Sequence, residues 1–244
     1  MKILVIGASS AIAKHCSRLW ANSGHEIYLV ARNNQQLANI TYDLELRGAI
    51  KVSSYCLDLN DTHRHIEMLD AAEATLGTID IVLIAHGTLS NQKNCEVSVE
   101  ETLAEINTNA ISTISLLTHI ANRLEANRAG TIAVISSVAG DRGKASNYVY
   151  GSAKAMITVF MSGLRQRLHQ SGVTVLTIKP GFVDTPMTAR FKKSIFWVSP
   201  HVVARNIIQA INNKQNEIYV PKFWRLVMII IRIIPNKIFR KIRL

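Results

Sequence analysis

The chain has 244 residues, of which 48% are hydrophobic and 18% are charged. This length and composition are typical of one globular domain with a filled core, and they exclude a disordered chain. The formal net charge is +11, but residues 218–244 contain no Asp or Glu and carry seven basic residues. The sequence is therefore a mildly basic body with a basic tail, and we expect no nucleic-acid partner.

The three cysteines, Cys16, Cys56 and Cys95, are too few and too scattered for a disulfide framework or a zinc site. We predict no metal site, and reduced thiols are typical of a cytosolic protein. The apolar run that opens the chain stops at Gly7, which is too short for the core of a signal peptide. We therefore expect a cytoplasmic location.

Short apolar runs alternate with helical patterns along the chain. They predict strands at 3–6, 26–31, 51–56, 79–84, 131–136, 173–178 and 217–220. The sequence Ser-Val-Glu-Glu at 98–101 is a capping box, which predicts a helix from there to about Glu125. Strands that alternate with helices require crossover connections, so we expect an α/β fold: a doubly wound parallel sheet of about seven strands with helices on both faces. We assign residues 1–221 to this domain and residues 222–244 to the tail.

The first predicted strand is followed by a turn of small residues and then by a helix. Gly7 permits a tight turn, and the small side chains after it leave backbone N–H groups accessible. These groups and the positive end of the helix dipole suit a pyrophosphate. We therefore predict a dinucleotide site that includes Gly7, Ser9, Ser10, Ala11 and Ile12. Alanines 11 and 13 stand where such turns usually carry glycine.

The end of the second predicted strand indicates which nucleotide binds. Ala31 stands where a carboxylate would be needed for the ribose hydroxyls of NAD, and Arg32 follows it. A guanidinium suits a 2′-phosphate, so we predict NADP(H) rather than NAD(H). Asp58, with Leu59 beside it, is a candidate for contact with the adenine, although an aspartate in this position also serves as a turn or helix cap.

Tyr150 and Lys154 are four residues apart in NYVYGSAKA (147–155), so a helix places them on one face. A nearby ammonium favours the phenolate, and a tyrosine tuned in this way can exchange a proton with a carbonyl oxygen. Tyr148 is six residues from the lysine, which is a poor spacing for a shared face. On its own, Tyr-x-x-x-Lys is more often an ordinary surface pair.

Two predicted strands end near this pair. Ser136 and Ser137 close the strand that precedes Tyr150. The next strand ends in a run that contains Pro180, Gly181, Val183 and Thr185. Doubly wound sheets build their sites at the carboxyl ends of their strands, where a serine hydroxyl can bind the same carbonyl oxygen as the tyrosine.

The serine, the Tyr-x-x-x-Lys and the Pro-Gly-x-x-x-Thr run, in this order and spacing, resemble the short-chain dehydrogenase/reductase family from Lys2 to about Val220. The resemblance implies an enzyme in which Ser137 orients the substrate carbonyl and Tyr150 is the general acid and base. Lys154 would hold the nicotinamide ribose and lower the tyrosine pKa.

The same resemblance implies a fourth catalytic residue, Asn107, beside a proton-relay water. Asn109 is the alternative, although its spacing fits less well. Cofactor contacts are implied at Ala85 and Gly87, in the sequence Ile-Ala-His-Gly where the family carries Asn-Asn-Ala-Gly. The loss of that asparagine implies a different local scaffold.

The tail contains an uninterrupted apolar run only from Leu226 to Ile231, which is too short to span a bilayer. Arg225 and Arg232 share a helix face, and Pro235 breaks the helix. The pattern predicts an amphipathic helix in the interface of an anionic membrane, at the inner face of the cell membrane. A helix that packs on the sheet or forms a dimer seam is the alternative. We also expect a homo-oligomer.

Within the family, residues 147–155, the Ala-Gly-Asp-Arg loop and the tail resemble the reductases that form decaprenylphosphoryl-arabinose. The resemblance implies a 2-keto pentose on a polyprenyl phosphate as substrate and a flavin oxidase as a partner. Arg142 and Lys144 would then meet the phosphate, or they are solvated loop charges. General reduction of soluble or lipid carbonyls and a non-catalytic NADP-binding role at a membrane are the alternatives, and the intact Asn, Ser, Tyr and Lys set argues against the second.

Overall fold

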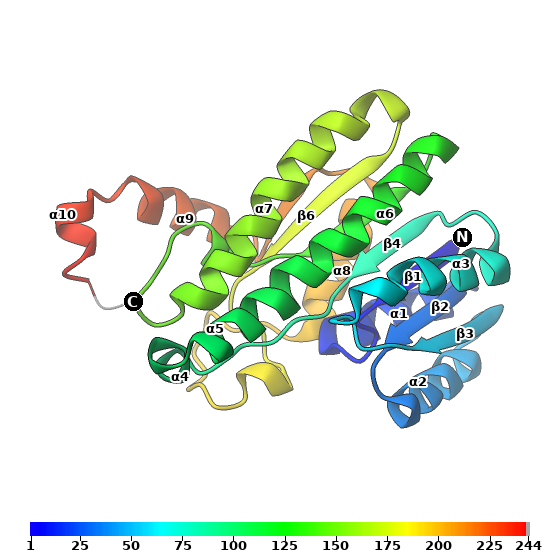
Figure 1. Ribbon diagram of the computed structural model, residues 1–244, viewed down its shortest axis with the longest axis horizontal. Helices are drawn as coiled ribbons and strands as arrows, with labels where there is room; N and C mark the ends of the chain where they lie inside the picture. The colour runs from blue at the N-terminus through cyan, green and yellow to red at the C-terminus, as the bar shows by residue number, and fades with distance from the viewer. Residues whose placement is uncertain (243–244) are drawn as a thin grey trace.

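A computed structural model describes residues 1–242, so Arg243 and Leu244 of the predicted tail lie outside the described residues. The seven predicted strands form one parallel sheet in the order β3-β2-β1-β4-β5-β6-β7 (Figure 1). They are β1 (Lys2–Ile6), β2 (Glu26–Ala31), β3 (Lys51–Cys56), β4 (Ile81–Ile84), β5 (Thr131–Ile135), β6 (Thr174–Pro180) and β7 (Glu217–Val220). The predicted fold class is confirmed.

Helices cover both faces of the sheet, as the crossover connections require. One face packs against α1 (Ala11–Asn22), α2 (Asn34–Leu46) and α8 (Pro200–Asn212). The other packs against α3 (His65–Leu76), α6 (Ser112–Asn127) and α7 (Tyr148–Leu168). Side chains alternate between the two faces, so Ile3 joins one core and Leu4 the other. Both faces are therefore apolar, and the strands appear in the sequence as continuous apolar runs.

The helix predicted from the capping box begins as expected but is not regular. The Ser98 hydroxyl accepts a hydrogen bond from the Glu101 N–H at 3.1 Å, which starts α5 (Val99–Ile106) after the short α4 (Gln92–Val97). A π-helical turn at Asn107–Ile111 then separates α5 from α6. A π-turn adds a residue to the hydrogen-bonded ring, so it changes which side chains share a helix face, and such turns are frequent at functional sites.

A buried ion cluster fixes the loop that follows β5. Lys179 Nζ lies 2.9 Å from Asp141 Oδ1 and 2.8 Å from Glu217 Oε2, and the Tyr219 hydroxyl donates a hydrogen bond to Asp141 at 2.8 Å. The Lys179 and Asp141 side chains are only 4% and 3% exposed. The loop between Ser137 and Tyr150 is thereby tied to β6 and β7.

The tail forms α9 (Phe223–Ile233) and α10 (Asn236–Phe239), which extend beyond the carboxyl edge of the sheet (Figure 1). Trp224 and Met228 on α9 are buried in a cluster with Val138 and Tyr219. The helix therefore packs on the body through one of its faces. None of the helices formed by residues 1–242 has the length and apolar character needed to cross a bilayer.

Candidate active site

A cleft of about 990 Å³ opens at the carboxyl edge of the sheet. It is lined by every residue predicted to contact the cofactor: Gly7, Ser9, Ser10, Ala11, Ile12, Arg32, Asp58, Leu59, Ala85, Gly87, Tyr150, Lys154, Pro180, Gly181, Val183 and Thr185. The parallel topology explains why residues so distant in the sequence meet, because the carboxyl ends of β1, β2, β3, β4 and β6 all open on one edge.

One end of the cleft has the features that a phosphate-bearing dinucleotide needs. The Ser10 side chain, at the N-cap of α1, makes no capping hydrogen bond, so the first N–H groups of the helix remain available to an anion. Arg32 is exposed at the rim. Asp58 Oδ1 accepts a hydrogen bond from the Asn60 N–H at 2.9 Å, so this aspartate does serve a turn while lining the cleft. These residues fit a dinucleotide cofactor.

Ser137 and Tyr150 meet at the opposite end of the cleft. The Ser137 hydroxyl hydrogen-bonds the Tyr150 phenol and accepts a hydrogen bond from the Ala139 N–H at 3.1 Å. Burial raises the pKa of Tyr150 to about 12, against the lowering effect of Ser137, and the Glu105 charge adds to the rise. Any lowering by Lys154, whose Nζ lies 5.6 Å from the ring centroid, is outweighed by burial, so the net shift of this pKa is upward and not downward as expected. The phenol is therefore a proton donor at neutral pH.

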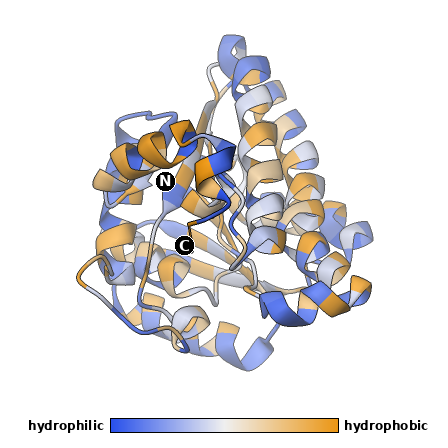
Figure 2. Ribbon diagram, turned by 90° about the vertical axis from the view of Figure 1, so that its left-hand side faces the viewer, coloured by the Kyte–Doolittle hydropathy of each residue, from blue (hydrophilic) through white to orange (hydrophobic). Residues whose placement is uncertain are grey.

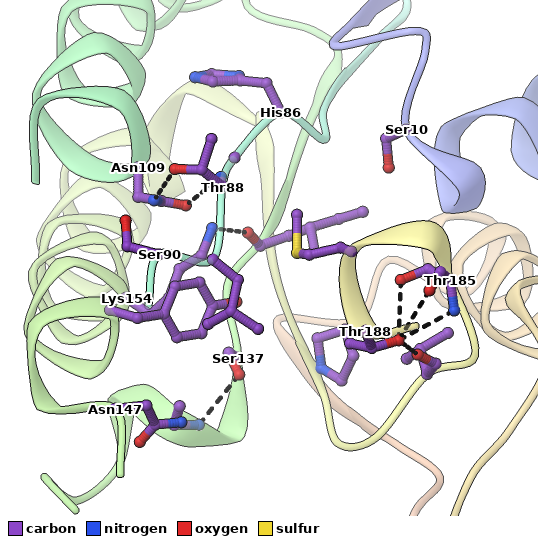
Figure 3. A pocket seen from close by; sticks show the side chains of 18 of the residues that line it. Ser10, His86, Thr88, Ser90, Asn109, Ser137, Asn147, Lys154, Thr185 and Thr188 are labelled. Carbon is purple, nitrogen blue, oxygen red and sulfur yellow. Dashed lines mark hydrogen bonds between the residues drawn. The ribbon is translucent and has the colours of Figure 1, made fainter. Parts of the chain in front are cut away.

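Lys154 is buried on α7, and its Nζ donates a hydrogen bond to the Ile135 carbonyl at 3.2 Å. Burial lowers the pKa of Lys154 to about 8, and the Glu105 carboxylate opposes that shift. The lysine therefore keeps most of its charge at pH 7 and loses it as the pH rises through about 8. Figure 3 shows its side chain between Asn109 and Ser137.

The structure places Asn109, and not Asn107, beside this lysine. Asn109 is fully buried, and a Cβ on Gly87 would lie 2.5 Å from Asn109 Oδ1 and 3.4 Å from Lys154 Nζ. Asn107 instead donates a hydrogen bond to Asn60 Oδ1 at 3.0 Å and does not line the cleft. The π-turn explains this correction, because it turns Asn109 toward the cleft.

Glu105 is a buried carboxylate that the sequence analysis missed. It is 2% exposed, and its Oε2 accepts hydrogen bonds from Ser90 and, at 2.7 Å, from Thr88. Its Oε1 has no hydrogen-bond partner among residues 1–242. Glu105 resembles its exposed neighbour Glu101 in the sequence, so only the packing reveals it.

His86 replaces the missing asparagine as a brace. Its Nε2 lies 2.9 Å from the Ser112 hydroxyl and 3.2 Å from that of Thr113, both at the start of α6. Those hydroxyls donate to the carbonyls of Thr108 and Asn109 in the π-turn. Burial, with the Lys154 charge as a second cause, lowers the pKa of His86 to about 3. The imidazole is therefore neutral, and it ties the end of β4 to the π-turn.

The two residues predicted to contact a substrate phosphate, Arg142 and Lys144, point to different parts of the structure. Lys144 lines the cleft, and burial lowers its pKa. Arg142 points instead to the tail, where its Nη1 donates hydrogen bonds to the carbonyls of Ile231 and, at 2.7 Å, Ile234. The prediction that Arg142 meets a substrate phosphate is thus corrected, because the guanidinium caps the C-terminal end of α9.

Aromatic side chains form the mouth of the cleft. Phe182 stacks on Trp197 and meets Trp224 edge-on, with ring centroids 5.3 Å apart in both pairs. Trp224 belongs to α9, so the tail supplies part of the cleft wall. A Cβ on Gly181 would lie 2.0 Å from Trp224 Nε1. Only glycine allows the indole to approach the end of β6 this closely.

Comparisons with known proteins identify relatives along most of the chain. Residues 1–195 match the family described as short chain dehydrogenase. An "uncharacterized oxidoreductase" of Mycobacterium tuberculosis is 34% identical over 239 residues, which cover 98% of this chain and 96% of the relative. The ketoacyl reductase HetN of Nostoc is 27% identical over 223 residues, which cover 89% of this chain and 77% of that one.

Two solved structures share the fold. A variant of actinorhodin polyketide ketoreductase, determined with NADPH, has a TM-score of 0.82 at 19% identity and covers 91% of this chain and 96% of its own. A short-chain type dehydrogenase/reductase from Mycobacterium ulcerans has a TM-score of 0.80 at 22% identity, with coverage of 89% and 86%.

We expect Gly181→Ala to displace α9, because the new methyl group would overlap the Trp224 indole. Overpacking of this kind costs about 1–3 kcal/mol of unfolding free energy. Denaturant unfolding and limited proteolysis of the tail measure the effect. Gly163→Ala is the matched control, because a Cβ there meets nothing within 4 Å. Trp224→Ala should remove the cost of Gly181→Ala, and wild-type stability in the single variant would contradict the packing.

Proposed function

This chain belongs to the short-chain dehydrogenase/reductase family, and we propose that it is an NADPH-dependent reductase of keto groups. It is an oxidoreductase with a doubly wound dinucleotide fold. One observation carries the proposal. Ser137, Tyr150 and Lys154 meet at one end of a cleft whose other end presents the start of α1 and Arg32.

The chain's own residues perform the proton chemistry. The cofactor, when bound, supplies a hydride to the carbonyl carbon. Ser137 holds the carbonyl oxygen. Tyr150, whose pKa is raised to about 12, is protonated at neutral pH and donates its proton to that oxygen as negative charge develops there. The ammonium of Lys154 then stabilises the phenolate that remains. The Ile135 carbonyl, which accepts a hydrogen bond from Lys154 Nζ at 3.2 Å, holds the lysine in position.

We infer that the substrate is a keto compound that carries an apolar chain. The aromatic mouth suits such a chain, and Lys144 in the cleft suits an attached anion. The names of two similar proteins, a ketoacyl reductase and a polyketide ketoreductase, support a keto group as the target. A 2-keto sugar on a polyprenyl phosphate, formed by a partner flavin oxidase, is our specific proposal within this class. Turnover of a panel of such keto compounds with NADPH tests it.

Tyr150→Phe should abolish turnover while NADPH still binds, because the phenol donates the proton and other residues contact the nucleotide. General acid catalysis contributes about 10²–10⁴-fold, so kcat should fall by that factor. Steady-state kinetics and an NADPH fluorescence titration measure the two effects. Tyr148→Phe, which changes an exposed phenol on the same helix, is the control. Near-normal turnover in Tyr150→Phe would refute the assignment.

NADPH should bind more tightly than NADH, because Arg32 offers the 2′-phosphate a charged partner. Arg32→Ala should reduce the preference by about 1.5–3 kcal/mol, the scale of a hydrogen bond to a charged group. Titration of both nucleotides measures it, and Arg205→Ala, which removes an exposed cation outside the cleft, is the control. Equal affinity for the two nucleotides in the unmutated protein would show that Arg32 has no such role.

Turnover should fall as the pH rises through about 8, where Lys154 loses its charge. Glu105→Gln removes a negative charge that favours charged Lys154, so the fall should move to lower pH. The pH profile of kcat/KM measures this shift. Glu101→Gln, one turn earlier on α5 and exposed, should leave the profile unchanged. An unchanged profile in Glu105→Gln would mean that this carboxylate does not influence the lysine.

A further inference from the structure

The outer face of α9 is apolar and uncovered by residues 1–242. Leu226, Ile229, Ile230 and Ile233 are 64%, 49%, 51% and 73% exposed, respectively. Their spacing places them in one stripe along the helix. Figure 2, in which α9 faces the viewer, shows the helix as strongly hydrophobic. We call these four side chains the outer stripe.

The stripe cannot turn inward, because both ends of α9 are held. Trp224 and Met228 on the opposite face are buried in the body. At the C-terminal end, the Arg142 guanidinium donates hydrogen bonds to the carbonyls of Ile231 and Ile234. It also lies over the Phe239 ring, 3.8 Å from the ring centroid. The outer stripe is thus a fixed surface of the protein.

The charges around the stripe have one sign. Every charged side chain of residues 218–242 is basic and exposed: Lys222, Arg225, Arg232, Lys237, Arg240 and Lys241. A second copy of this surface would bring like charges together with no carboxylate of the tail to pair them. An anionic lipid surface offers both complements, headgroup phosphates for the cations and acyl chains for the stripe.

Phe223 shares a helix face with Leu226 and Ile230 of the outer stripe, and its ring contacts lead toward the mouth of the cleft. Phe223 lies at the start of α9, with its ring centroid 5.5 Å from that of Trp224 and 5.9 Å from that of Phe196. Trp224 in turn contacts Phe182 at the mouth. An apolar path therefore leads from the start of the tail helix to the mouth of the cleft.

We propose that the outer stripe and its basic flanks dock on an anionic bilayer, and that docking sets the aromatic mouth at the lipid surface. The access route rests on the proposed reduction of chain-bearing keto compounds, whereas the docking itself does not. A keto group on a lipid chain would then reach Tyr150 while the chain stays in apolar surroundings.

The first test measures docking alone, by co-sedimentation of the full chain with vesicles. Vesicles of phosphatidylcholine with phosphatidylglycerol should retain the protein at low salt and release much of it at high salt. The double variant Leu226→Glu/Ile230→Glu should lower partitioning by at least about tenfold, because it places two charges in the apolar stripe. Val159→Glu, which changes an exposed apolar residue of another helix, should bind normally.

The second test measures access, by comparing reduction of a long-chain keto compound in these vesicles with that of a short, water-dissolved analogue. The double variant should lose activity only on the first. If wild-type protein docks but reduces neither, the proposed function fails and docking stands. If it reduces both equally and vesicles never retain it, docking fails. If the double variant instead abolishes self-association measured by sedimentation velocity, a second copy covers the stripe and the proposal is overturned.

Discussion

The contact between the Trp224 indole and Gly181 joins the tail to the cleft. Gly181 directly follows β6, and the absence of a side chain there lets the indole lie against the backbone at the carboxyl edge of the sheet. Met228 packs in the same cluster as Val138, which follows Ser137. The tail is thus part of the wall of the cleft, although it lies beyond the last strand of the sheet.

The loop after Ser137 holds the tail and the sheet together by two neighbouring charges. Asp141 pairs with Lys179 in the interior, and Arg142 caps α9. Breaking a buried pair leaves an uncompensated charge, so such pairs fix a loop more strongly than surface pairs do. The geometry of Ser137 therefore depends on contacts made by both β6 and α9.

The electrostatics of the cleft follow from burial. Tyr150 and Lys154 both favour their neutral forms when desolvated, which raises the pKa of the phenol and lowers that of the ammonium. Glu105 supplies the negative charge that keeps Lys154 protonated near neutral pH. A protonated tyrosine beside a charged lysine is the state needed to donate a proton and then stabilise the resulting phenolate.

Sequence reasoning predicted the features that depend on the periodicity of apolar residues and on the motifs at strand ends. The strands and the sheet follow from apolar runs, and the motifs at the carboxyl edge bring the sixteen residues predicted to contact the cofactor into one cleft. Sequence reasoning was wrong, or missed a residue, where tertiary contacts determine the position of the side chain. The π-turn selects Asn109 over Asn107, the packing of α5 buries Glu105 and leaves Glu101 exposed, and the position of α9 draws Arg142 away from the cleft. No local spacing encodes these three outcomes.

Transfer of deuterium tests the proposed reduction most directly. The protein would be incubated with NADPH that carries deuterium at the transferable position of the nicotinamide ring, and with long-chain keto compounds held in anionic vesicles. We predict deuterium on the carbinol carbon of the product, detected by mass spectrometry. Tight NADPH binding with no deuterium in any product would contradict the account.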